Sequence, residues 1–536
     1  MATLMPYSLD QKTPWQVSSL ERIFRRSGLF RWQLKSNDDP SIKSGLQDHW
    51  RGNASVGASI IERGEDWYGD GHAFDDFGWL RDLRAFGGSQ ARAQGRQLIE
   101  RWLRQNQNWH LEKWQPDLMG DRLAHLVTSY SWYGESATTE FQDRLAQSIA
   151  SQARCLALDW RRMTGVVSKL RALRGLAIAE AALSNSANQM IALLDLAVPL
   201  VSATLNEDGG HKSRMPDLQI VILRLLIELR SAAAFANVSA DDRLDELISR
   251  MGAMARMWRH ADGQMAHFNG AGMISAEQIE ETLVRAGPRG KVLQQAPYTG
   301  FLRFSSGRST VIMDAGSPAQ KSNGEPLVRG FGILSFEFSI GSTPFIVNAG
   351  QTAADPNFNR LLCSTSAHST LALDEHNSSD PSQNRIAQVS GVEVGPASGG
   401  ILAVASHDGF EISHGILHHR QIYLATGGAN LRGADLLEYT GAPGEIPRQA
   451  LLRFHLHPKV SAAMLGNGRV LMKIRGNRAG WTFKAANASV GLDNSVFFEA
   501  GIRQSCQQIV LRAPLGSIRS VGTHEVKWAF QRSDPS

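Results

Sequence analysis

The sequence predicts a multidomain α+β protein, in which an N-terminal incomplete (α/α) toroid is followed by a C-terminal antiparallel β-sandwich. Apolar residues recur at spacings of three and four through the first half of the chain, and they alternate with polar residues in the second half. Tryptophan divides the chain in the same way, since only Trp481 and Trp528 of the 13 tryptophans follow residue 260. A length of 536 residues allows two or three domains with sizeable cores.

The first half is expected to fold as successive amphipathic helices. In one of them Leu218, Val221, Ile222 and Leu225 follow the spacing of a single helix face, and Gly, Pro, Asn or Asp occupies most of the gaps between helices. Helices joined by short loops pair with their neighbours, which suits a toroid. The expected helices span residues 90–105, 121–133, 138–160, 165–183, 189–205, 218–234 and 240–260.

The second half changes to a period of two from Pro297 onward. Phe301, Arg303 and Ser305 begin this alternation, and Gly-rich or Asn-Gly turn signals recur every dozen residues or so. We therefore expect the break between helices and strands to fall between residues 280 and 300. The predicted domains are an N-terminal extension with the start of the helical domain (1–78), the toroid (79–290) and the β-sandwich (291–536).

Composition and charge limit the classes of function that the chain can have. With 56 basic and 51 acidic residues the formal charge is +5, and the pI is near 9.1. This excess favours an anionic ligand such as an acidic glycan or a phosphate, but it is too small to predict nucleic-acid binding. Cys155, Cys363 and Cys506 are widely spaced and odd in number, which argues against a disulfide framework and against a cysteine-based zinc site.

Targeting signals are not evident in the sequence. The first 26 residues have no apolar run of the length that a secretory signal needs, and no apolar stretch is long enough to span a membrane. We therefore expect a cytoplasmic protein with no membrane span.

One stretch, from Leu334 to Asn377, suggests the edge of an active site. Two strand-like runs flank a polar, turn-rich insert that ends at His368, and the apolar run 371–373 follows. A histidine held at the mouth of a strand can exchange protons near neutral pH. The alternative is a surface or capping histidine.

The same stretch resembles a known family. GFGILSFEF (330–338), TPFIVNAG (343–350) and STSAHSTLALD (364–374), in this order, resemble the C-terminal domain of the heparinase II/III-like polysaccharide lyases. EDGGHKSRMP (207–216) and ADGQMAHFNGAG (261–272) resemble motifs of the family's toroid. The resemblance implies β-elimination on an acidic, uronate-containing glycan without an organic cofactor, and family members are often periplasmic.

Such a reaction needs three groups around one sugar ring: a partner for the carboxylate, a base for the C5 proton and an acid for the leaving oxygen at C4. The resemblance makes His211 and His368 the catalytic candidates, without deciding which is base and which is acid. We expect both to face one cleft, with Arg214 receiving the carboxylate and Lys212 beside it. For His211 the alternative is a solvated loop.

Further substrate-binding candidates come from two places. His267 and Asn269 resemble another cleft motif of the family, although a simple Asn-Gly turn fits them equally well. Arg122, Tyr130 and Tyr133 fall along one predicted helix and offer aromatic faces for sugar rings, with a helix core as the alternative.

The sequence also departs from the family. No tyrosine lies between Tyr133 and Tyr298, where these lyases carry a catalytic one. Gly330–Gly332 stands where many have a histidine, and Cys363 replaces an arginine. Either a divergent lyase uses other residues, or the scaffold binds glycans or serves in envelope assembly without catalysis.

Two further possibilities remain open. A glycoside hydrolase would need carboxylates in the toroid, and Asp75, Asp76, Asp82 and Asp121 are the candidates. A structural divalent metal has little support, because the histidines lack a matching carboxylate pattern. The histidines considered for it are His414, His418, His419, His455 and His457.

Overall fold

The computed structural model describes most of the chain and divides it into two compact units. The described residues are 15–35, 39–64, 67, 74–184, 186–238, 242–288, 290–318, 330–352, 355–379, 386–441, 445–476 and 479–533. Unit 1 consists of Met1–Thr204 and Val221–Ser249, and unit 2 consists of Leu205–Ile220 and Arg250–Ser536. The N-terminal residues 1–14, on which the targeting expectation rests, lie outside the described part.

The compact units and the predicted domains divide the chain differently. The last helix of the helical half, α13 (Ala276–Arg285), ends shortly before the first strand, β1 (Gln295–Ala296), so the change from helix to strand falls within 280–300. Residues 205–220 and 250–290 nevertheless group with the strands in unit 2, although the sequence assigns them to the toroid. The turns that carry His211 and His267 therefore belong to the same unit as His368.

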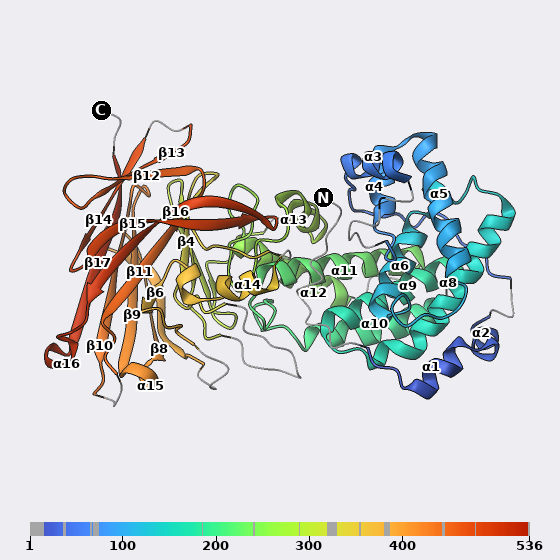
Figure 1. The fold of residues 1–536 in the computed structure, drawn as a ribbon, viewed down its shortest axis with the longest axis horizontal. Helices are drawn as coiled ribbons and strands as arrows, with labels where there is room; N and C mark the ends of the chain where they lie inside the picture. Colours follow the sequence, from blue (N-terminus) through green and yellow to red (C-terminus); the bar gives the residue numbers. More distant parts are fainter. Residues whose placement is uncertain are drawn as a thin grey trace. The chain divides into compact units, whose positions relative to one another are not determined.

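Helices form unit 1 (Figure 1). Capping residues set several of their starts: the Thr138 hydroxyl accepts the N–H of Phe141 at the start of α8, and the side-chain Oδ1 of Asn53 accepts the N–H groups of Ser55 and Val56 at the start of α3. The helices are α1 (Ser19–Arg26), α2 (Gly28–Leu34), α3 (Ala54–Arg63), α4 (Trp79–Phe86), α5 (Gly88–Gln105), α6 (Pro116–Thr128), α7 (Tyr130–Tyr133), α8 (Thr139–Asp159), α9 (Val166–Leu183) and α10 (Ala187–Ser202), and α11 (Pro216–Phe235) and α12 (Asp242–Trp258) run through both units.

The predicted helix over 121–133 is two helices. It begins earlier, because Pro116 occupies the first helical position, and it breaks at Ser129 between α6 and α7. Helices α1 to α4 and α13 were not among the predicted ones. All five span ten residues or fewer, so their periodicity covers only two or three turns.

Two glycines allow α6 and α9 to approach closely. A Cβ on Gly120 would overlap the backbone of Arg171, and a Cβ on Gly175 would overlap the backbone of Gly120. Neither position needs a left-handed backbone, so close packing accounts for both glycines.

Unit 2 contains two antiparallel sheets. The nine-stranded sheet has the order β1-β2-β3-β4-β5-β11-β16-β15, with β6 paired to β11, and the eight-stranded sheet has the order β12-β13-β14-β17-β10-β9-β8-β7. The strands after β1 are β2 (Phe301–Ser306), β3 (Ser309–Asp314), β4 (Phe336–Ile340), β5 (Thr343–Val347), β6 (Leu371–Leu373), β7 (Val389–Ala397), β8 (Gly400–Phe410), β9 (Ile416–Ala425), β10 (Asn430–Tyr439), β11 (Gln449–Leu456), β12 (Val460–Met464), β13 (Val470–Ile474), β14 (Gly480–Ala486), β15 (Ser489–Glu499), β16 (Ile502–Pro514) and β17 (Thr523–Ser533). Two short helices, α15 (Glu411–His414) and α16 (Ile518–Val521), and α14 (Pro356–Leu362) lie in the connections.

Aromatic side chains fill the space between the sheets. Phe336 of β4 stacks on Trp528 of β17 with ring centroids 5.6 Å apart, and Phe345 of β5 lies 5.5 Å from Trp481 of β14. These contacts join the two sheets into a sandwich, so the predicted fold class is confirmed. Among the described residues no helix has the length and apolar character to cross a membrane.

Replacing Gly175 by alanine tests the close approach of α6 and α9. We expect G175A to lower the free energy of unfolding of unit 1 by about 1–3 kcal/mol, because its methyl group forces the helices apart. Urea denaturation followed by circular dichroism measures this. The control is G95A in α5, where a Cβ meets only ordinary contacts at 3.6 Å and helix propensity predicts a gain of about 1 kcal/mol. Equal effects of the two substitutions would contradict the packing argument.

Candidate functional site

A buried carboxylate, Glu337 of β4, organises the polar region of unit 2. Its side chain is 3% exposed. Oε2 accepts a hydrogen bond from Nε2 of His260 at 2.9 Å, and Oε1 accepts the backbone N–H groups of His267 at 3.0 Å and Asn348 at 2.9 Å. Burial alone would raise the pKa of Glu337, but the His260 hydrogen bond and the nearby His267 outweigh it, so the pKa is lowered. The charged carboxylate therefore ties the 260–267 turn to β4 and to the end of β5.

His368 has a defined tautomer. It follows a 3₁₀ turn over Thr365–Ala367, and its Nδ1 lies 2.8 Å from the carbonyl oxygen of Ser364. Because a carbonyl only accepts, Nδ1 carries the proton and Nε2 keeps its lone pair. Burial lowers the pKa of His368, and the Ser364 carbonyl and Glu337 partly oppose that shift. At neutral pH His368 is a proton acceptor at Nε2.

Glycines make room for the His368 ring. A Cβ on Gly332 would overlap the imidazole, and a Cβ on Gly330 would lie 3.3 Å from Nε2 of His368 and 3.3 Å from the Cα of Asn269. The space that the imidazole occupies explains why glycine stands at positions 330 and 332, where the family resemblance leads one to expect a histidine. It also places Asn269 and His368 on two sides of the same residue, Gly330.

His211 has the opposite tautomer. It pairs with Leu205 across the turn, and its Nδ1 accepts the backbone N–H of Ser213 at 3.1 Å, with the Ser213 hydroxyl at 2.7 Å. The proton of the neutral ring is therefore on Nε2. This Nε2 is buried and has no hydrogen-bond partner among the described residues. Burial, assisted by Lys212, lowers the pKa of His211 to about 4, so His211 presents an unpaired N–H donor at neutral pH.

Arg214, predicted to receive a substrate carboxylate, is committed within the protein. Nε donates to the carbonyl of Thr299 at 2.8 Å, and Nη2 contacts the carbonyl of Gly300 and forms an ion pair with Asp314. The residue is 5% exposed and its backbone has a φ of +59°. Asp314, the carboxylate that pairs with Arg214, lies 100 positions away in the sequence. The local motif around Arg214 gives no sign of this partner, so the arginine was expected to be available to a substrate.

The remaining candidates of unit 2 flank these groups. The amide nitrogen of Asn269 donates to the carbonyl of Arg214 at 3.1 Å and so links the two turns. The His267 ring stacks on Phe497 with centroids 4.9 Å apart, and its Nδ1 is buried without a partner among the described residues. Lys212 is exposed. His211, His267, Asn269 and His368 thus belong to one unit, whereas the predicted domain boundary placed the first three in the toroid and His368 in the β-sandwich.

The candidates of unit 1 lie in its core. Arg122 is fully buried. Its Nε donates a hydrogen bond to the side-chain oxygen of Gln152 at 2.6 Å, and both of its terminal nitrogens donate to backbone carbonyls. Tyr133 donates its hydroxyl to the carbonyl of Leu126 at 3.0 Å, and Tyr130 packs edge-on against it. These contacts correct the expectation that the three residues offer faces to sugar rings, because the helix stripe is a core stripe.

The carboxylates considered for hydrolysis are also engaged. Asp121 forms ion pairs with Arg171 and Arg174, Asp82 accepts the N–H of Asn53 at 2.7 Å, and Asp75 accepts the indole N–H of Trp102 at 2.7 Å. Burial raises the pKa of Asp76 to about 6, and the backbone N–H of Gly78 opposes the shift. All four carboxylates thus have hydrogen-bond or ion-pair partners within the protein.

The other histidines have structural partners within the sandwich domain. His455 bonds Ser495 and the carbonyl of Ser366, and burial lowers its pKa to about 3. His418 lies between His407 and Asp435, at 3.0 and 2.7 Å. His457 lies edge-on to Phe497, His414 contacts the carbonyl of Glu445, and His419 bonds Glu438. Among the described residues no group of three or more His, Cys, Asp or Glu is arranged to hold a metal ion.

Arg420 connects this interior cluster to the candidate site. Its Nε donates to Asp435 at 2.7 Å, and Nη1 donates to the carbonyls of Leu334 at 2.8 Å and Ser369 at 3.1 Å. Ser369 is the neighbour of His368, and its N–H donates to the side chain of Asn348 at 2.9 Å. The loop that holds His368 is therefore anchored from both sheets.

Sequence reasoning missed three residues of this region. Glu337 and His260 form a hydrogen-bonded pair although they are 77 positions apart in the sequence. The only sequence signal for it was the acidic residue within the predicted strand LSFEF. Tyr298 flanks the His211 turn, since its backbone N–H and that of Thr299 donate to Asp208 at 3.0 and 2.7 Å. Its hydroxyl is hydrogen-bonded to Glu207, which raises the pKa of Tyr298. The residue is 60% exposed.

Neutralising Glu337 tests its organising role. We expect E337Q to lower the free energy of unfolding by about 2 kcal/mol, because three charge-assisted hydrogen bonds become neutral ones. Urea denaturation measures the loss. The matched control is E438Q, because the wild-type Glu438 side chain is 51% exposed and pairs with His419 at the surface. This control should change the free energy of unfolding by less than about 0.5 kcal/mol. If the two variants lose the same stability, Glu337 has no special role.

The buried His211 predicts a pH dependence of stability. The folded-state pKa is about 4 and the unfolded value is about 6.5, so below pH 6.5 the unfolded chain takes up a proton that the folded chain does not. The free energy of unfolding should therefore fall between pH 6.5 and 4, with His211 contributing up to roughly 3 kcal/mol. H211Q should reduce this slope, as measured by urea denaturation across that range. The exposed His110 supplies the control, H110Q, and an equal slope in both variants would contradict the assignment.

Comparisons with known proteins identify relatives of the fold. Residues 288–529 match the family model "Heparinase II/III-like, C-terminal". The chain is 27% identical over 490 residues to FtsZ-localized protein C of Caulobacter vibrioides (strain NA1000 / CB15N). The aligned region covers 86% of this chain and 81% of that protein.

Two solved structures share the fold. A mutant of the heparan sulfate lyase HepC from Pedobacter heparinus superimposes with a TM-score of 0.66 at 13% identity, over 94% of this chain and 87% of that one. Heparinase III gives a TM-score of 0.65 at 12% identity, over 95% and 89%. Residues 288–529 therefore match the C-terminal domain of the heparinase II/III-like family, and the chain as a whole has the fold of heparinase III.

Proposed function

We propose that this chain is a polysaccharide lyase that cleaves an acidic, uronate-containing glycan by β-elimination. The observation that carries the proposal is the pair of opposite tautomers in unit 2: His368 has a lone pair at Nε2, and His211 has an unpaired N–H at Nε2. A lyase needs one acceptor for the C5 proton and one donor toward the substrate carboxylate, and these histidines supply one each.

In the proposed reaction His368 is the base. Its Nε2 takes the proton from C5, the C4–C5 double bond forms, and the bond from C4 to the leaving oxygen breaks. His211 is neutral, because its pKa is about 4, so it does not release its proton at neutral pH. Its N–H instead donates a hydrogen bond to the C6 carboxylate, which is the role that the sequence argument gave to Arg214.

The leaving oxygen needs a proton, and Tyr298 is the residue we propose for it. The family's toroid tyrosine has no counterpart between Tyr133 and Tyr298. Tyr298 keeps its proton at neutral pH, since the hydrogen bond to Glu207 raises its pKa. It flanks the turn that carries His211, through the hydrogen bonds that its backbone makes to Asp208.

A second candidate function is a non-catalytic, glycan-binding role on the same scaffold. The burial of Arg122 and the pairing of Arg214 favour it, because both remove cations from the expected substrate site. The similarity to FtsZ-localized protein C suggests that such a protein acts where FtsZ is found. In that case the chain would bind an acidic glycan without changing it, and it would colocalise with FtsZ.

A glycan panel separates the two candidates. Incubation with uronate-containing glycans should produce the ultraviolet absorbance of an unsaturated product. H368A should lower kcat/KM by about 100-fold or more, as loss of a general base does, and H211A and Y298F should each lower it by about tenfold or more. The exposed His110 provides the control variant, H110A, with wild-type turnover.

Two outcomes would contradict lyase activity. Binding of a glycan with no absorbance change across the panel would support the non-catalytic function. Release of reducing ends without that absorbance would indicate hydrolysis. Wild-type turnover in H368A would remove His368 from the mechanism even if the chain is a lyase.

A further inference from the structure

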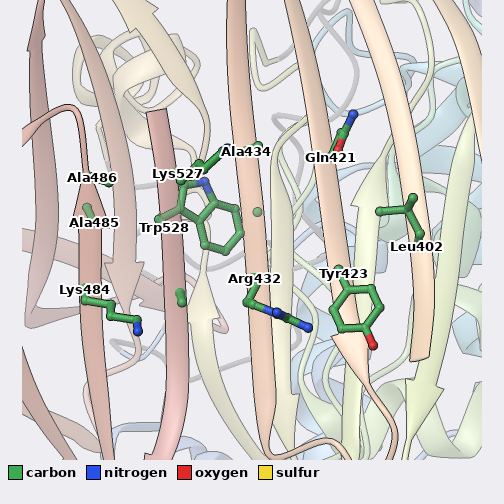
Figure 2. A pocket seen from close by; sticks show the side chains of 12 residues that line it. Leu402, Gln421, Tyr423, Arg432, Ala434, Lys484, Ala485, Ala486, Lys527 and Trp528 are labelled. Carbon is green, nitrogen blue, oxygen red and sulfur yellow. The ribbon is translucent and has the colours of Figure 1, made fainter. Parts of the chain in front are cut away.

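A hollow lies on the outer face of the eight-stranded sheet, away from the residues discussed so far (Figure 2). Its volume is about 610 Å³. It crosses β14, β17, β10, β9 and β8, so five neighbouring strands contribute to it.

The register of the strands explains the hollow. Lys484 pairs with Ala529, Ala529 with Arg432, and Arg432 with Tyr423, which gives one row across the sheet. The adjacent outward-facing row is Ala486, Lys527, Ala434 and Gln421. Ala529 lies between Lys484 and Arg432 in the first row, and Ala434 lies between Lys527 and Gln421 in the second. The sheet surface is therefore low at these two alanines and raised at a rim formed by the longer side chains that flank them.

The rim is cationic. Arg432, Lys484 and Lys527 border the hollow, and no carboxylate is among the residues that line it. Lys527 is 62% exposed and contacts Glu525 at 3.0 Å, a surface pair of little strength. Arg432 and Lys484 stand two strands apart, a separation of about 10 Å between backbones. The surface thus offers positive charges around an apolar floor, which is complementary to carboxylates spaced along an apolar chain.

The aromatic groups argue against a sugar in this hollow. The guanidinium of Arg432 lies 4.5 Å from the centroid of the Tyr423 ring, and the Tyr423 hydroxyl donates to the carbonyl of Ser398 at 2.8 Å. Trp528 is 2% exposed, because its ring stacks on Phe336 in the core and its N–H donates to Asp435. Neither ring presents an open face on which a pyranose would stack. A concave surface also fits a flat membrane poorly.

We propose that this hollow is a docking site for an acidic segment of a partner protein. An extended peptide crosses the strands, its carboxylates pair with Arg432 and Lys484, and its small or apolar side chains rest on Ala434 and Ala529. Charge-assisted hydrogen bonds give the specificity, and the alanine floor excludes water from the contact. The docking site is independent of the proposed glycan chemistry, since none of its residues belongs to that site.

Fluorescence anisotropy of the full chain tests this. The probe is a fluorescein-labelled peptide in which glutamate alternates with alanine and leucine, and a matched peptide carries glutamine in place of glutamate. The wild-type chain should bind the glutamate peptide at least about tenfold more tightly than the glutamine peptide, with an affinity that falls as salt rises. The double variant R432E/K484E should weaken glutamate-peptide binding by about tenfold or more.

Two further variants keep the test decisive. K473E reverses an exposed charge on β13 of the same sheet, outside the hollow, and should bind within about twofold of the wild type. A486W places a large ring on an exposed position of the floor and should weaken binding without changing charge. Circular dichroism confirms that each variant is folded.

Three results would overturn the proposal. The first is equal peptide binding by R432E/K484E and K473E. The second is no binding of the glutamate peptide by the wild-type chain. The third is binding of a heparin oligosaccharide or of phosphatidylglycerol vesicles that R432E/K484E abolishes while the peptide does not compete, which would assign the hollow to a glycan or a membrane.

Discussion

The candidate site depends on one buried charge, the carboxylate of Glu337. Taking a carboxylate out of water is costly unless it is fully hydrogen-bonded, and Glu337 meets this condition with three donors from two separate segments. Those donors come from His260, from the backbone of His267 and from the backbone of Asn348. One side chain of β4 thereby fixes the turn that follows α12 and the end of β5. Asn348 in turn holds the N–H of Ser369, so the same charge is linked to the His368 loop.

In the proposed lyase, the chemistry follows from the tautomers of two histidines rather than from charge. Burial keeps His211 and His368 neutral near pH 7, so neither provides a cation. The Ser364 carbonyl and the Ser213 backbone N–H then decide which nitrogen of each ring carries the proton. Histidine thereby supplies both the proton acceptor, at His368, and the hydrogen-bond donor, at His211. The arginines that a glycan site would use are instead structural, which distinguishes this chain from the arrangement the motifs suggested.

Local patterns predicted the fold but only part of the site. The helical period, the alternation after Pro297 and the family motifs are short-range signals, and they correctly located the helical and the β-sheet parts of the chain. Arg214 and Arg122 were misjudged because their partners, Asp314 and Gln152, are distant in sequence. The pairing of Glu337 with His260 and the overlap of Gly332 with the His368 ring also depend on tertiary packing. A sequence read position by position contains no signal for such contacts.

Histidine side-chain NMR tests the central claim most directly, namely that neutral His211 and His368 of fixed tautomer form one ligand site. In long-range ¹H–¹⁵N spectra of the free chain, His368 should show the Nδ1–H form and His211 the Nε2–H form. Addition of a heparan sulfate oligosaccharide should shift the signals of His211, His267 and His368 and leave the interior His407 and His418 unchanged. The opposite tautomers, or an oligosaccharide that binds without shifting any of the first three signals, would contradict the account.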